Sequence, residues 1–135
     1  MRTIDRHFID ELYQQAELSE RKRSHFLLHQ SHQDKVQRLM IALVKGSYVE
    51  PHFHELPHQW EMFSVTEGCI KVCIHDAKGK IINEFMAGPA EETILVEFAP
   101  NEIHSVECIS ERALMLEVKE GPFDPRYAKS FSKSL

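Results

Sequence analysis

The feature that most constrains the fold of this chain is a series of short apolar segments between residues 36 and 119. The segments are rich in β-branched and aromatic residues, and Gly, Pro, Asn or Asp turn signals recur about every 8 to 12 residues. Such a series is typical of a β-sandwich or a jelly-roll barrel. The expected strands are residues 36–44, 48–54, 61–66, 69–75, 80–86, 93–98, 103–110 and 112–119.

One helix is expected before the strands. Residues 4–18 carry apolar side chains at helical spacing, which predicts an amphipathic helix with Thr3 as its cap and Asp5 in its first turn. We therefore divide the single domain into a helix and connector at 1–34, a barrel at 35–120 and an irregular tail at 121–135.

The connector holds a basic cluster with three histidines. One interpretation is a solvated link that its apolar residues 26–28 pin to the barrel. The other places Arg23, His25 or His29 at the mouth of a pocket, where these side chains hold an anionic ligand.

Composition excludes several classes of protein. The chain has 135 residues, enough for one domain with a sizeable core, and a net charge of −5, which argues against a general nucleic-acid partner. No apolar run approaches the roughly 20 residues of a membrane span, so we expect no membrane partner. The N-terminus lacks the apolar core of a signal peptide. The three cysteines show no CxxC spacing, so we expect reduced thiols and a cytoplasmic location.

The residues with the clearest chemistry are two histidines separated by one residue. In an extended chain the side chains of His52 and His54 point to the same face, so both imidazoles can reach one point. Glu61 begins an apolar run that can return antiparallel to that strand. His104 follows a turn in which Asn101 tolerates a left-handed backbone, and it is the natural fourth ligand. Imidazole and carboxylate together suit a divalent metal.

These positions resemble the two motifs of the cupin superfamily. Residues 46–68 are similar to the first motif, with Gly46 and Gly68 at its ends, and residues 100–104 are similar to the second. The gap of six residues between the second histidine and the glutamate is wider than usual, which enlarges the loop at the metal rim. Ala99 and Asn101 stand where the second motif normally has proline and glycine.

Nearly the whole chain resembles the WbuC-type cupin fold metalloproteins, in residues 21–29, 36–38, 48–52, 60–61 and 117–125. The resemblance implies an all-β cupin double-stranded β-helix with a short N-terminal α-helix. It also implies one divalent transition metal per chain (Fe, Zn, Mn or Ni) at the four ligands above. This family is linked to bacterial O-antigen gene clusters, and its activity is not settled.

Three classes of function remain open. The first is a metal-dependent enzyme acting on a small molecule, such as a sugar or nucleotide sugar of surface polysaccharide metabolism. The second is a cupin that binds or senses a small molecule without turnover, and the third is a protein with a purely structural metal. Octahedral coordination leaves two positions open for a ligand, whereas tetrahedral zinc is closed by four protein ligands. We expect a homodimer, because the helix and an open-sided barrel both need apolar faces covered.

Further candidates surround the expected metal. His58 lies at the centre of the widened loop, where it can replace a ligand or act as a general base, or else lie exposed at the rim. Gln37 and Glu117 are polar positions in apolar strands and either line the lumen or face outward. Glu117 is also a catalytic candidate, and Phe63 should form an apolar pocket wall. Arg23 and His29 are candidates for gripping the ligand.

Overall fold

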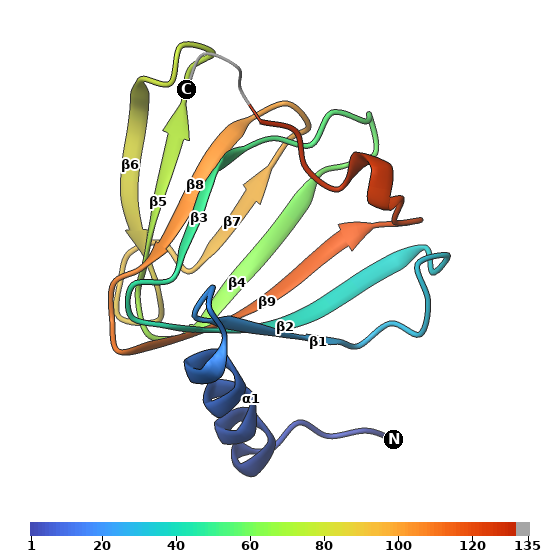
Figure 1. Cartoon of the computed structure of the whole chain (residues 1–135), viewed down its shortest axis with the longest axis vertical. Coiled ribbons are helices and arrows are strands. Elements are labelled where there is room, and N and C mark those ends of the chain that lie inside the picture. The colour runs from blue at the N-terminus through green and yellow to red at the C-terminus, as the bar shows by residue number, and fades with distance from the viewer. Residues whose placement is uncertain (132–135) are drawn as a thin grey trace.

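In a computed structural model, of which residues 1–131 are described, the protein consists of two facing antiparallel sheets with one helix outside them (Figure 1). The elements are α1 (Arg6–Leu18), β1 (Arg23–Leu27), β2 (Val36–Val44), β3 (Tyr48–His52), β4 (Glu61–Glu67), β5 (Ile70–His75), β6 (Ile81–Ala87), β7 (Leu95–Phe98), β8 (Ile103–Cys108), β9 (Arg112–Glu120) and the 3₁₀ turn η1 (Pro125–Tyr127). The expected all-β class with an N-terminal helix is confirmed. No helix in residues 1–131 is long and apolar enough to cross a membrane.

The first sheet has the order β1-β2-β9-β4-β7 and the second the order β3-β8-β5-β6. Neighbours far apart in sequence, such as β2 with β9 and β3 with β8, pair antiparallel, as a jelly roll requires. The β3–β8 pairing sets His52 directly opposite His104. β4 lies between β7 and β9, and it brings Glu61 to the same end of the sandwich.

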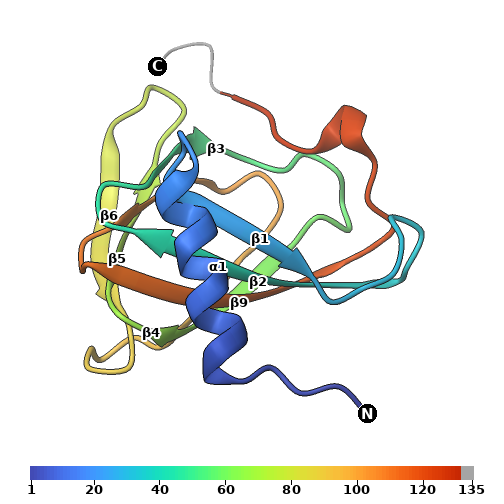
Figure 2. The same ribbon diagram turned by 60° about the horizontal axis from the view of Figure 1, so that its bottom comes forward.

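The alternation of side chains along β2 explains how the layers are held together. Leu39, Ile41 and Leu43 point between the sheets into the main core. Ala42 points the other way, toward the helix. One strand therefore contributes to two apolar clusters, and Figure 2 shows α1 lying across the outer face of its sheet.

The helix begins two residues later than the sequence predicts. Asp5 is its N-cap, and the Asp5 carboxylate accepts a hydrogen bond from the Phe8 backbone N–H at 2.9 Å. The expectation of Thr3 as the cap is wrong, because a carboxylate one turn before the first apolar residue is already suitably placed. The buried face of the helix consists of Leu12, Tyr13 and Ala16.

The segment expected to be a connector contains a strand. β1 pairs along its whole length with β2, from Arg23 opposite Leu43 to Leu27 opposite Leu39. This strand is the edge of its sheet. Arg23 and His25 line the cavity between the sheets, whereas Phe26 packs against the cluster that includes the helix. The basic composition hid it, because an edge strand needs backbone pairing and tolerates charged side chains.

The chain after β9 returns across the open side of the sandwich (Figure 1). Ser130 forms a two-way backbone pair with Phe53, with N–O distances of 2.9 and 2.8 Å. Gln59 Nε2 donates to the Tyr127 carbonyl at 2.7 Å, which fastens the widened loop to the same segment. Of the expected irregular tail, residues 132–135 lie outside the described part of the chain.

Candidate metal centre

Three strands and one loop bring four potential metal ligands together at the end of the sandwich. His52 ends β3, His54 follows it, Glu61 begins β4 and His104 lies near the start of β8. One ligand atom from each side chain lies within 4.8 Å of all the others. Metal–ligand bonds of about 2.0–2.2 Å put opposite ligands roughly 4.4 Å apart, so small shifts suffice for an ion to bind all four.

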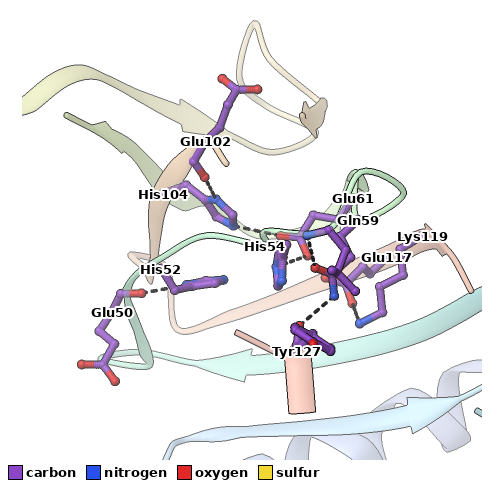
Figure 3. A network of polar contacts seen from close by, with 11 residues as sticks. Glu50, His52, His54, Gln59, Glu61, Glu102, His104, Glu117, Lys119 and Tyr127 are labelled. Atoms are coloured by element: carbon purple, nitrogen blue, oxygen red, sulfur yellow. Dashed lines mark hydrogen bonds and ion pairs between the residues drawn. The ribbon is translucent and has the colours of Figure 1, made fainter. Parts of the chain in front are cut away.

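The backbone fixes the tautomer of two of the imidazoles (Figure 3). His52 Nδ1 lies 2.8 Å from the Glu50 carbonyl oxygen, and His104 Nδ1 lies 2.8 Å from the Glu102 carbonyl oxygen. A carbonyl can only accept, so each Nδ1 carries the proton and donates it. In the neutral imidazole this leaves the Nε2 lone pair free, which is the usual arrangement of a metal-binding histidine.

Glu61 lies between two of these rings. Its carboxylate oxygens are 2.9 Å from His104 Nε2 and 3.0 Å from His54 Nε2. His54 Nε2 is buried and has no hydrogen-bond partner among residues 1–131, although the Glu61 carboxylate lies 3.0 Å away. A buried polar atom without a partner is costly. A cation among these acceptor atoms would satisfy it, so the residues fit a divalent metal.

The electrostatics of the cluster point the same way. Burial, together with the neighbouring His104, lowers the pKa of His52 to about 3, so this imidazole is neutral at physiological pH. Burial opposes ionisation of Glu61, but the interactions with His104 and His54 outweigh it and hold the pKa of this carboxyl well below its ordinary value. His52 as a neutral imidazole and Glu61 as an ionised carboxylate are in the protonation states that metal ligands require.

The cluster borders a cavity of about 260 Å³ between the two sheets. Phe63, 2% exposed, forms part of its apolar wall, as the sequence predicts. Phe98 lies behind the cluster and stacks on His104 with ring centroids 3.8 Å apart. This stacking fixes the plane of the imidazole, while the open side of the cluster faces the cavity.

Glu117 also faces this cavity rather than solvent. It lies opposite Phe63 in the pairing of β4 with β9, and Lys119 Nζ is 3.8 Å from its carboxylate. Burial, and then the nearby charge of Glu61, raises the pKa of Glu117 to about 7. Of the two readings of this residue, the structure places it in the lumen.

The side chains of Gln37 and His29 are both buried, and both form hydrogen bonds with backbone groups. Gln37 Nε2 donates to the carbonyl oxygen of Asp34 at 2.7 Å, and it borders a smaller opening beside His54 and Glu61. His29 Nδ1 accepts the backbone N–H of Arg38 at 3.0 Å, and His29 does not line the cavity. The structure therefore does not bring His29 to the site.

The rim of the site differs from the expectation. His58 is outside the four-residue cluster and borders neither the main cavity nor the smaller opening beside it. Arg23 does lie at the mouth of the cavity, and Arg21 and Lys129, which the sequence did not single out for this role, join it there. Arg21 belongs to the basic cluster of the connector, so the sequence could have predicted it at the cavity mouth. No feature of the sequence near Lys129 predicts that this residue reaches the cavity.

Comparison of the sequence with known families gives one match. The model of a family described as "Domain of unknown function (DUF6016)" matches residues 4–87. The chain belongs to this family. The matched region includes the first three candidate ligands and ends before His104. No curated protein sequence matches this DUF6016 chain.

Solved structures show the fold more broadly. Capsular polysaccharide assembling protein CapF from Staphylococcus aureus aligns with a TM-score of 0.69 and 17% identity over 84% of this chain, which spans only 32% of CapF. Oxalate oxidase in complex with glycolate aligns with a TM-score of 0.61 and 14% identity. The alignment covers 84% of this chain and 56% of the oxalate oxidase chain. A cupin superfamily protein from Desulfitobacterium hafniense aligns with a TM-score of 0.57 and 18% identity. The alignment covers 78% of this chain and 85% of that protein. The fold of this DUF6016 chain is therefore that of the cupin superfamily.

Proposed function

We propose that this protein binds one divalent transition metal through His52, His54, Glu61 and His104 and presents it to a small molecule in the adjoining cavity. The observation that carries the proposal is the cluster itself, with four ligand atoms within 4.8 Å of one another, among them the buried His54 Nε2 that has no hydrogen-bond partner in residues 1–131. Fe, Zn, Mn and Ni all suit three imidazoles and one carboxylate.

The position of the cluster favours a binding or catalytic role over a purely structural metal. A structural ion is normally enclosed by its ligands, whereas here the cluster forms part of the wall of a 260 Å³ cavity. A bound metal would supply Lewis-acid polarisation of a carbonyl or hydroxyl oxygen. Glu117, which faces the same cavity, is the chain's own candidate to hold or accept a proton there.

Two versions of this function remain in competition. The first is an enzyme of surface polysaccharide metabolism, supported by the resemblance to WbuC-type proteins and by the similar fold of CapF, a capsular polysaccharide assembling protein. The second is a cupin that binds its ligand without turnover. The cavity is below the roughly 300–1,000 Å³ of drug-sized sites, which favours a small molecule over a whole nucleotide sugar inside the barrel.

Two further features belong to the proposal. We propose a homodimer, because β6 and the segment before β7 expose Ile81, Ile82 and Ile94 together with other large apolar side chains. We also propose a cytoplasmic location, in line with the free thiols of the three cysteines.

Metal analysis of variants tests the site. The protein purified without added metal should carry close to one equivalent of a transition metal, and His52→Ala/His54→Ala should lose it. His58→Ala is the matched control, because it removes an imidazole just outside the cluster and should keep the metal. The assignment fails if the double variant retains the parent's metal content or if His58→Ala loses it equally. Turnover assays on candidate sugars then separate the enzyme from the binding protein.

A further inference from the structure

Positive charge gathers at one place on an otherwise acidic protein. The net charge is −5, yet the main cavity is lined by four cationic side chains, Arg21, Arg23, Lys119 and Lys129, and by only two acidic ones, Glu61 and Glu117. A bound divalent metal would make the cavity still more positive. Narrow openings with one sign of charge concentrate ligands of the opposite sign.

Three of these cations have no counter-ion. Arg21, Arg23 and Lys129 form no ion pair with any residue in 1–131, whereas Lys119 lies 3.8 Å from Glu117. Arg23 donates one hydrogen bond, from Nη1 to the Tyr48 carbonyl at 3.4 Å, and its other guanidinium donors remain available. Unpaired cations at a cavity mouth keep their hydrogen-bonding capacity for a ligand.

The three cations come from two segments that the fold places on either side of the opening. Arg23 is the first residue of β1, which is the edge of the first sheet, and Arg21 lies two residues before it. Lys129 lies on the C-terminal segment, and the adjacent Ser130 pairs with Phe53 just beyond β3, the edge of the second sheet. The returning chain in Figure 1 therefore completes the rim.

The same three side chains repel one another. Loss of hydration, followed by the charge of Arg21, lowers the pKa of Arg23. Loss of hydration, followed by Arg23 and Arg21, lowers the pKa of Lys129. Glu50 offsets part of this repulsion at Arg23, and Glu61 and Glu117 offset part of it at Lys129. The pKa of each group is lowered nevertheless, and an anion bound at the rim would relieve the remaining repulsion.

Apolar side chains make up much of the rest of the cavity wall. Leu43, Val49, Phe63 and Met115 all line the cavity. Such walls offer few partners for a molecule with hydroxyl groups on every carbon. The cavity therefore suits a compact body with polar groups at two ends.

We propose that the cavity binds a small organic anion whose carboxylate or phosphate group lies against Arg21, Arg23 and Lys129 while its other end reaches the metal cluster. This inference rests on the proposed function only for the metal end of the ligand. The rim contacts are made by the chain alone and do not require the metal.

Calorimetric titration of the full chain with matched probes tests the proposal. 3-Hydroxypropyl phosphate is compared with 1,3-propanediol, and glycolate with ethylene glycol, so that each probe has polar groups at two ends and each pair differs in the anionic group. We expect at least one anionic probe to bind and both neutral probes to bind undetectably. Which anion binds more tightly separates a phosphate site from a carboxylate site.

Substitutions at the rim test the residues. Arg23→Gln should weaken binding of the anionic probe roughly 10–100-fold, the usual loss of a charge-assisted contact. Lys129→Gln, on an exposed segment outside the barrel core, should weaken it without lowering the melting temperature. Arg38→Gln is the matched control, because this exposed arginine on β2 does not line the cavity and should bind the probe within twofold of the parent.

The outcomes separate the two proposals. If metal loads normally but charged and neutral probes bind alike, or if Arg23→Gln and Arg38→Gln have equal effects, the anion site is wrong while the metal site stands. An absence of binding by both anionic probes also overturns the anion site. If no metal binds but the metal-free protein still takes up an anionic probe in an Arg23-dependent way, the anion site stands and the metal function fails.

Discussion

Replacing Glu61 by glutamine separates the metal account from a purely structural role for this residue. The side chain is 8% exposed and lies between the Nε2 atoms of His54 and His104. Burying an ionised carboxylate costs several kcal/mol, and hydrogen bonds to such a group return about 1.5–3 kcal/mol each. In the metal-free protein, the amide introduced by Glu61→Gln can donate to an Nε2 lone pair. The free energy of unfolding should therefore stay within about 1 kcal/mol of the parent or rise.

The metal-bound protein should behave in the opposite way. At a free metal concentration 100 times the parent's Kd, binding adds about 2.7 kcal/mol to the stability. If Glu61→Gln weakens the affinity about 100-fold, the same concentration adds only RT ln 2, about 0.4 kcal/mol. For a domain of this size, 1 kcal/mol shifts the melting temperature by roughly 3–5 °C, so the expected rise is about 8–13 °C for the parent and about 1–2 °C for the variant.

The assay is thermal unfolding of metal-stripped protein, with and without a fixed concentration of the metal found in the native protein. Glu97→Gln is the control, because this exposed glutamate on the neighbouring strand β7 has the same charge and should leave both melting temperatures unchanged. A full metal-dependent rise in Glu61→Gln would refute the reasoning. So would a loss of more than about 2 kcal/mol in the metal-free variant, since that would make Glu61 a structural ion-pair partner.

Three further predictions concern the frame and the rim. Gly68→Ala should destabilise the protein by more than about 2 kcal/mol in urea unfolding, because φ is +75° there and a Cβ would overlap the Arg112 carbonyl oxygen; a smaller change would contradict it. Burial raises the pKa of Cys108 to about 11, so at pH 8 a thiol reagent should label it only after unfolding, and labelling of native protein would count against the fold. Burial and nearby cations lower the pKa of His25 to about 4 from its ordinary 6.5, so this residue contributes stability above pH 6.5 that is lost as the pH falls toward 4. In metal-free protein, His25→Gln should reduce the fall in melting temperature between pH 6.5 and pH 4. An unchanged pH dependence would show that His25 is not its source.

Much of the frame could be predicted because it depends on local patterns. The strand at 36–44 has the predicted bounds, and Asn101 has the expected left-handed backbone, with φ of 71°. The grouping of His52 and His54 follows from the two-residue period of an extended chain, and the β3–β8 register supplies His104. These features need only residue spacing and a jelly-roll topology.

The rest depends on long-range pairing, which leaves little local signal. β1 is a strand because β2 offers a partner along its length, although its sequence reads as a basic connector. Lys129 reaches the rim because the segment around Ser130 pairs with Phe53, far away in the sequence. His29 looked like a ligand-binding residue, but its Nδ1 is used by the Arg38 backbone.

Anomalous diffraction at the absorption edge of the bound metal tests the central claim most directly. Crystals of protein purified without added metal should show one strong peak per chain, within bonding distance of the Nε2 atoms of His52, His54 and His104 and of the Glu61 carboxylate. Crystals of Glu61→Gln should show a weaker peak at the same position. A peak elsewhere in the chain, or no peak after soaking with Fe, Zn, Mn and Ni, would contradict the account.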